Sequence, residues 1–368
     1  MIRMALITAA LVLAGQAHAA CRADVAPVVT LDFGSRYADG DASRSTLDKT
    51  SSKAVTQALK PVDTFIRQLA RGSNAVLRDP AGETDRAACL VSAIDGWAKA
   101  DALSSMESFN AGLALGSRLA GIAEAYRQLR PHSHDSAARN RIEDWLKRRA
   151  RDQIDFWEIE ATTGARDGNL RAWASLGVLL AGKAADDDFA RFWAYGATAR
   201  ILCTARDDGS LPQETKRGSY ALHYQFHAVA PLVTIAAHGK ADGIAVPEMC
   251  NRALERVVGF TLTDFAAGGT ATAGYSGQAQ GFFDQDPARM AHHFAWLPAY
   301  LHAVDDPAAR ALLPRFETLA NSKLGGDQML IWGANDPAEP ALAPTDAVLR
   351  PTITPRAPAF APVKPAFP

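Results

Sequence analysis

Several features are missing from the 368-residue sequence. After its first residues, no apolar run approaches the roughly 20 residues that a membrane-spanning helix needs. There is no CxxC pair and no His/Cys cluster, so a structural zinc site is not expected. The formal net charge of −1 argues against a polybasic nucleic-acid binder. Alternating apolar and polar residues are rare, which argues against a fold built on sheets.

The amino terminus has the layout of a secretory signal. Arg3 precedes an apolar run at residues 4–13, and Ala17-His-Ala19 resembles a cleavage site. We therefore expect residues 1–19 to be a signal peptide, and the mature chain to be periplasmic or secreted without membrane insertion. A lipidated Cys21 is disfavoured, because His18 stands where an aliphatic residue is expected.

Four cysteines remain in this exported chain, and they can pair in three ways. Disulfides are typical of oxidising compartments such as the periplasm. We favour Cys21–Cys89 together with Cys203–Cys250, because each of these bridges closes a single loop.

Apolar residues recur at helical spacing throughout residues 20–333, which predicts an all-α architecture, while this length allows one large core or two small ones. One helix is expected to begin behind a cap at Asp135. Others are expected at 189–203, 220–238, 247–265, 288–304 and 307–320.

Three segments depart from this helical pattern. Residues 35–43 and 268–281 are rich in Gly and polar residues, so we expect loops of the kind that serve as lids or binding segments. Residues 334–368 hold nearly half of the chain's 20 prolines and are expected to form a disordered tail.

Arg217 and Tyr224 are the most informative pair of residues. They stand seven residues apart, so on one helix they would share a face. A guanidinium beside a phenol favours the phenolate, which makes the tyrosine a candidate general base. The pair alone also fits an ordinary half-exposed helix surface.

Around these residues the sequence resembles the alginate lyase family of bacterial polysaccharide lyases, which cleave poly(β-D-mannuronate). The resemblance covers most of the mature chain and depends on colinear motifs. These are Ser35-Arg-Tyr37, Ile142-Glu-Asp-Trp145, residues 208–217, Ala221-Leu-His-Tyr224, Phe294-Ala-Trp-Leu297 and Leu324-Gly-Gly326. It implies a fold that periodicity alone does not predict, an incomplete (α/α) toroid of helical hairpins with a deep substrate cleft.

The resemblance also implies roles for particular residues. Tyr224 matches the catalytic tyrosine, Arg217 the arginine beside it, and Asn169 the asparagine that binds the substrate carboxylate. Arg36 and Tyr37 match lid residues, and Trp173 matches a tryptophan just past the asparagine.

One departure from the family pattern is serious. Leu170 stands where the family has a histidine next to the asparagine. Either the enzyme works without that histidine, another histidine has replaced it, or activity has been lost. His227, three residues after Tyr224, shares its helix face and is a better substitute than the adjacent His223.

The implied chemistry is β-elimination from a uronate. In mannuronate and glucuronate the C5 proton and O4 lie on the same face of the sugar, so one tyrosine serves as both base and acid. Guluronate needs a second group, and the loss of the histidine should affect it most. This reaction requires no metal and no cofactor.

The sequence therefore predicts a monomeric polysaccharide lyase acting on polymannuronate, or alginate, and on glucuronan. Its partner is the anionic polysaccharide, not a nucleic acid. A catalytically weak or inactive polysaccharide-binding relative is the first alternative, and Leu170 motivates it. A scaffold protein that binds partners through its Pro-rich tail is the second.

Overall fold

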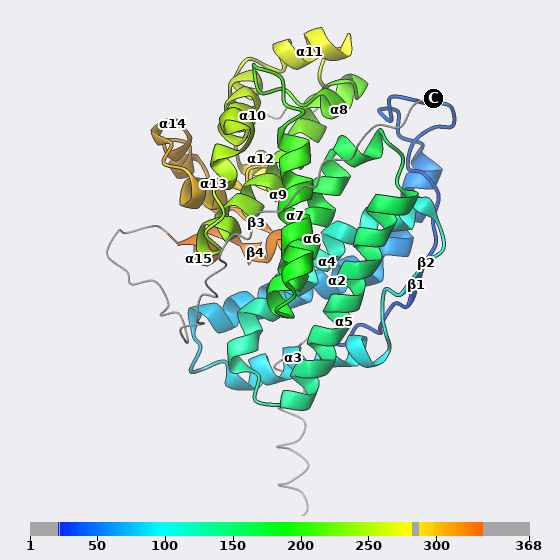
Figure 1. Ribbon diagram of the computed structural model, residues 1–368, viewed down its shortest axis with the longest axis vertical. Coiled ribbons are helices and arrows are strands. Elements are labelled where there is room, and N and C mark those ends of the chain that lie inside the picture. Colours follow the sequence, from blue (N-terminus) through cyan, green and yellow to red (C-terminus); the bar gives the residue numbers. More distant parts are fainter. Residues whose placement is uncertain (1–20, 22, 282–286, 334–368) are drawn as a thin grey trace, which may run out of the picture. The chain divides into compact units, whose positions relative to one another are not determined.

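The computed structural model describes residues 21, 23–281 and 287–333 (Figure 1). The expected signal peptide and the Pro-rich tail lie outside these residues. The all-α prediction is confirmed. Eight helices of 15 residues or more make up most of the described part: α2 (Lys49–Arg78), α3 (Thr84–Lys99), α4 (Phe109–Leu129), α5 (Ser136–Asp155), α6 (Asn169–Ala184), α7 (Asp188–Leu202), α9 (Ala221–Ala241) and α10 (Met249–Ala266).

The helices form hairpins arranged in two layers (Figure 1). One layer contains α2, α4, α6 and α9, each packed on the next, followed by α13 (Leu297–Ala303). The other contains α3, α5, α7 and α10, and each of these helices packs on the next in chain order. Each helix of the second layer also packs on its hairpin partner in the first. This is the (α/α) toroid architecture.

Two glycines allow α4 and α6 to cross closely. A Cβ on Gly116 would lie 2.4 Å from the Ala174 Cα, and a Cβ on Gly177 would lie 2.4 Å from the Gly116 carbonyl oxygen. Both distances are shorter than van der Waals contact. The close packing of α4 on α6 therefore requires residues without a side chain at these two positions.

The last described segment returns to the first helices. It contains the antiparallel strands β3 (Ala320–Asn321) and β4 (Gly326–Asp327) and then α15 (Gln328–Trp332). Asn74 on α2 donates from Nδ2 to the Gly325 carbonyl at 3.0 Å and accepts from the Asp327 N–H at 2.7 Å. Gly325 and Gly326 have φ values of +93° and +111°, which explains the two glycines of this motif.

Both predicted disulfides are present, Cys21–Cys89 and Cys203–Cys250. The predicted cap is also confirmed, because the Asp135 carboxylate accepts from the Ala138 N–H at 3.0 Å. A short parallel pair joins β1 (Thr30–Leu31) to β2 (Ser105–Met106). No helix among the described residues is long and apolar enough to cross a membrane.

Three sequence predictions are wrong in detail. The expected helix 288–304 is split into α12 (Pro287–Met290) and α13, because Pro298 in the first turn of α13 favours a new helix start there. The helix expected at 307–320 ends early, as α14 (Pro307–Arg310) and a 3₁₀ turn at Leu313–Arg315 that contains a proline. The loop expected at 268–281 contains α11 (Thr270–Ser276), with left-handed glycines at both ends, Gly269 and Gly277.

Candidate active site

Arg217 and Tyr224 are in contact, but not on one helix. Tyr224 lies in the first turn of α9, whereas Arg217 precedes a 3₁₀ turn, η4 (Gly218–Tyr220). Gly218 has a φ of +53°, which breaks the helical path that the spacing suggested. The Arg217 guanidinium carbon nevertheless lies 4.0 Å from the centre of the Tyr224 ring. The contact is a cation–π stack that the turn creates.

The predicted lid segment lies against this turn. The Arg217 guanidinium carbon is also 5.9 Å from the centre of the Tyr37 ring, and its Nη2 donates to the Arg44 carbonyl at 3.4 Å. Tyr37 and Leu47 form an antiparallel bridge, which holds residues 37–47 as a closed loop. Burial raises the pKa of Tyr37, while the charge of Arg217 opposes this shift.

Arg36 is directed toward α2. Its Nη1 donates to the Thr56 hydroxyl at 2.8 Å and to the Ser52 carbonyl at 3.1 Å. Burial and the nearby Arg118 lower its pKa. The two lid residues implied by the resemblance thus face different partners, and only Tyr37 lies beside Arg217.

Asn169 is held by a residue that the sequence analysis did not select. Its backbone N–H and its Nδ2 both donate to the Glu214 carboxylate, at 2.7 and 2.6 Å. Glu214 lies on the short helix α8 (Pro212–Thr215) and is fully buried. Burial raises its pKa to about 7, against the opposing charge of Arg217 and the Asn169 hydrogen bonds.

His227 occupies the other side of Asn169. The His227 Nδ1 lies 2.9 Å from the Asn169 Oδ1. Because the Asn169 amide nitrogen is directed at Glu214, its oxygen faces His227 and accepts from the Nδ1–H tautomer, whereas the Trp173 Nε1, 3.1 Å from the same Nδ1, donates to it in the other tautomer. In the Nδ1–H tautomer the Nε2 of His227 carries the lone pair. A chain of hydrogen bonds therefore runs from Glu214 through Asn169 to His227.

Trp173 is hydrogen-bonded to His227. Its side chain is 2% exposed, and its Nε1 donates to the His227 carbonyl at 3.0 Å. The ring is therefore covered in this structure, which favours a positioning role over the sugar contact that its motif implied. The helical apolar pattern predicts that Trp97, Trp145, Trp157 and Trp193 lie in the core. The first three are buried, whereas Trp193 is half-buried and its Nε1 donates to the Glu158 carboxylate at 2.9 Å.

Leu170 faces away from this chain of hydrogen bonds. It is half-buried and packs on the apolar cluster of Phe156, Trp157, Ala161 and Ala174. The imidazole that lies within hydrogen-bonding distance of the Asn169 side chain is that of His227. This arrangement fits the alternative in which another histidine replaces the missing one.

Further histidines surround Tyr224. The His223 ring centre lies 5.2 Å from that of Tyr224 and 5.7 Å from that of His293. Burial lowers the pKa of His223 and of His293 to about 4, and that of His227 well below its usual value. Burial also lowers the pKa of His292. These imidazoles are neutral at pH 7.

Lys323 is a second residue that the sequence analysis missed. Burial, then the neighbouring Arg118, lowers its pKa to about 7, whereas Asp63 opposes the shift. Arg118 pairs with Asp63 through its Nε at 3.0 Å. The only available signal was position, because Lys323 immediately precedes the Leu324-Gly-Gly326 motif.

Several known proteins resemble this chain. The family model for alginate lyase matches residues 111–271. A polysaccharide lyase of Stenotrophomonas maltophilia is 33% identical over 224 residues, which cover 59% of this chain and 65% of that protein. An alginate lyase of Azotobacter vinelandii is 30% identical over 320 residues, covering 84% and 82% of the two chains.

Solved structures agree on the fold. A histidine-to-alanine variant of alginate lyase A1-III complexed with a tetrasaccharide superposes with a TM-score of 0.71 at 21% identity, covering 83% of this chain and 84% of that one. The enzyme from Sphingomonas species A1 gives 0.68 at 21% identity, covering 84% and 86%. With the Azotobacter match across most of both chains, these similarities show that the chain belongs to the alginate lyase family of polysaccharide lyases.

Proposed function

We propose that this chain cleaves β-1,4-linked uronate polymers by syn β-elimination, with the polymannuronate of alginate as its first substrate and glucuronan as its second. The observation that carries the proposal is the Arg217 guanidinium stacked 4.0 Å over the Tyr224 ring. It places a fixed positive charge beside the one side chain that the reaction needs as both base and acid. Curated relatives named alginate lyase support the substrate class.

In the proposed reaction the Tyr224 phenolate removes the C5 proton of the uronate. The electron pair of the broken C5–H bond forms the C4–C5 double bond, and the C4–O bond breaks. Tyr224, now protonated, returns that proton to the departing O4. Because the proton and O4 lie on one face in mannuronate and glucuronate, Tyr224 does not need to move between the two transfers.

The substrate carboxylate must be neutralised while negative charge develops beside it. Asn169 supplies for this the Nδ2 hydrogen that it does not donate to Glu214, and its hydrogen bonds to Glu214 fix the amide plane before substrate arrives. Arg217 adds a positive charge and favours the phenolate of Tyr224. None of these steps requires a metal ion or a cofactor.

His227 takes over the part of the missing family histidine in this proposal. In the tautomer that donates its Nδ1–H to Asn169, its Nε2 has a lone pair that can accept a hydrogen bond or a proton. Its lowered pKa keeps the imidazole neutral at pH 7, so that a ring nitrogen without a hydrogen stays available as an acceptor. His223 is proposed as a neighbouring contact on the same side of Tyr224.

Cationic residues around this cluster favour a polyanionic substrate. Arg36, Arg118 and Lys323 act on one another electrostatically, and Asp63 is their acidic neighbour. Uronate polymers carry one carboxylate per sugar, so a cleft lined in this way would hold successive residues. Tyr37 and Arg36 are proposed to close over the bound chain.

The test is the ultraviolet absorbance of unsaturated uronate released from polymannuronate, polyguluronate, glucuronan and hyaluronan. We expect a rise on polymannuronate and a smaller one on glucuronan, and we expect Tyr224→Phe to abolish both while keeping the melting temperature and polymer binding. Near-normal turnover in Tyr224→Phe would reject Tyr224 as base and acid. Binding without any release of product by the unaltered chain would favour the inactive relative that Leu170 suggests.

Export to the periplasm as a monomer is part of the same proposal. The two disulfides support an oxidising compartment. Cell fractionation and light scattering of the exported chain test it. A cytoplasmic chain that retains residues 1–19 would contradict the proposal.

A further inference from the structure

One turn joins the two residues on which the proposed reaction depends most. The turn η4 follows Arg217 and precedes α9, which carries Tyr224 in its first turn. The first N–H groups of a helix have no partner within the helix, so they need acceptors from outside it. The residue before α9, Tyr220, does not supply one, because its side chain caps none of the described N–H groups of the helix.

Gln280 supplies such an acceptor and also binds the start of η4. Its Oε1 accepts from the Leu222 N–H at 2.9 Å, and its Nε2 donates to the Gly218 carbonyl at 3.1 Å. Gly218 is the residue after Arg217, and Leu222 stands two residues before Tyr224. A single amide therefore binds both ends of the turn that brings the guanidinium and the phenol together.

The α11 segment, residues 268–281, also binds the middle of this turn. The Gln278 Oε1 accepts from the Ser219 N–H at 3.0 Å. A Cβ on Gly218 would lie 2.7 Å from the Ser45 Oγ and 3.0 Å from the Gln278 Oε1. The turn thus packs closely against both the α11 segment and the predicted lid segment.

The α11 segment is itself anchored at two points. At the start of α11, the buried carboxylate of Asp264 on α10 accepts from the Ala271 N–H at 2.7 Å. Near the end of α11, the Tyr275 hydroxyl donates to the Asp208 carboxylate at 2.7 Å, and the Arg206 guanidinium carbon lies 4.3 Å from the centre of the Tyr275 ring. The glutamine side chains that follow are therefore presented to η4 from a fixed position.

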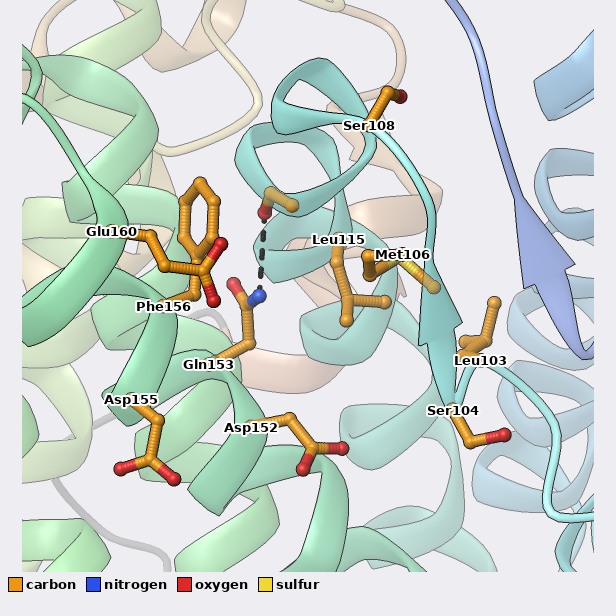
Figure 2. A pocket seen from close by; sticks show the side chains of 11 residues that line it. Leu103, Ser104, Met106, Ser108, Leu115, Asp152, Gln153, Asp155, Phe156 and Glu160 are labelled. Carbon is orange, nitrogen blue, oxygen red and sulfur yellow. Dashed lines mark hydrogen bonds between the residues drawn. The ribbon is translucent and has the colours of Figure 1, made fainter.

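Another glutamine amide joins two elements elsewhere in the domain and provides a comparison. At the cavity where the end of α5 meets the start of α4, the Gln153 Nε2 donates to the Gly112 carbonyl at 3.3 Å (Figure 2). The described residues that line this cavity include neither Arg217 nor Tyr224. Loss of the Gln153 amide should therefore affect the packing of α5 on α4 and not the catalytic cluster.

We propose that Gln280 is a positioning residue for the reaction, because its amide holds η4 in the shape that keeps the Arg217 guanidinium over the Tyr224 ring. This inference rests on the proposed role of Tyr224 as base and acid. Without the amide, the Leu222 N–H and the Gly218 carbonyl would bind water, and the turn could relax. The guanidinium would then lie beside the phenol in fewer molecules, so the phenolate would form at higher pH.

The variant Gln280→Met tests the proposal, since it removes both hydrogen bonds at nearly unchanged size. The ultraviolet absorbance of the phenolate, measured as the difference from the same chain carrying Tyr224→Phe, gives the pH at which Tyr224 ionises. We expect Gln280→Met to move this titration to higher pH by about 0.5–1 unit, and kcat on polymannuronate at pH 7 to fall by about 3- to 10-fold, because that much less phenolate is present. Gln280→Asn, one carbon shorter, cannot reach both groups and should shift the titration less; it decides the question if Gln280→Met does not fold.

Gln153→Met is the matched control. Its melting temperature should fall, while the Tyr224 titration and the pH dependence of kcat should stay as in the unaltered chain. A folded Gln280 variant with an unchanged Tyr224 titration would overturn the proposal, whatever its melting temperature. The titration requires no turnover, so it decides the role of Gln280 separately: failure of the unaltered chain to release product from any polymer would refute the proposed function instead.

Discussion

Replacing Glu214 with glutamine tests how Asn169 is held. The Glu214 carboxylate accepts from the backbone N–H and the Nδ2 of Asn169, at 2.7 and 2.6 Å. Glutamine has the same size but only one acceptor oxygen, so its NH₂ group must face one of these donors. We expect the Asn169 amide to rotate, which turns its nitrogen toward His227 and disrupts the hydrogen bond to the His227 Nδ1.

The size of the effect follows from the bonds that are lost. A hydrogen bond to a charged group contributes about 1.5–3 kcal/mol. If the loss falls on the transition state, where the uronate carboxylate gains charge, kcat/KM should fall by about 10- to 100-fold. We expect most of this decrease in kcat, because the substrate also has contacts that do not involve Asn169.

Stability should also change its dependence on pH. Burial raises the Glu214 pKa from 4.5 to about 7, so between these values the folded chain holds a proton that the unfolded chain has lost. The free energy of unfolding should therefore fall as pH rises from 4.5 to 7, by about 3 kcal/mol for this group. In Glu214→Gln this contribution disappears.

Steady-state kinetics on polymannuronate and urea unfolding from pH 5 to 8 provide the measurements. Glu248→Gln, which changes an exposed carboxylate before α10, is the control and should match the unaltered chain in both. A folded Glu214→Gln variant with unchanged kcat and KM would refute the positioning role of Glu214. An unchanged slope of stability against pH would show that Glu214 does not titrate in this range.

Three other changes test separate parts of the structure. Leu170→His should lower the free energy of unfolding by about 1–3 kcal/mol, because an unpaired imidazole would lie among apolar neighbours, and it should leave the substrate profile unchanged; a gain of activity on guluronate polymers would show instead that this position faces the sugar. Gly177→Ala should lower the free energy of unfolding by about 1–3 kcal/mol, because its Cβ meets the Gly116 carbonyl oxygen, whereas Gly196→Ala, with open space around it, should not. Removing residues 334–368 should leave the melting temperature and the activity on soluble polymer unchanged, and a large loss of stability would show that the tail packs on the domain.

Periodicity and capping predicted the long helices because each buries one face over many turns. The Asp135 cap of α5 is one example. The same rules failed near Pro298 and Pro314, where a proline starts or ends a helix inside a stretch whose apolar spacing continues.

The candidate site was predictable only in part. Arg217 and Tyr224 were selected for a shared helix face, yet Gly218 and a 3₁₀ turn bring them together. Glu214 gave no signal and Lys323 only its position before the Leu324-Gly-Gly326 motif, because a single Glu or Lys in a sequence does not reveal the contacts that folding will give it. Their importance depends on contacts across 45 residues for Glu214 and on the packing of Ser322–Leu324 against α2 and α4 for Lys323.

The hydrogen bond between Asn74 and Gly325 joins residues 251 positions apart. Closing so long a loop costs conformational entropy before any contact compensates for it, so this closure should come late in folding. A ribosome releases Tyr224 and Arg217 well before Lys323, and a chain cut short after α10 would carry the proposed base without Lys323, whose charge acts on His227. Completion of the site is thereby tied to completion of the polypeptide, which would keep a partly synthesised chain from acting as a finished enzyme.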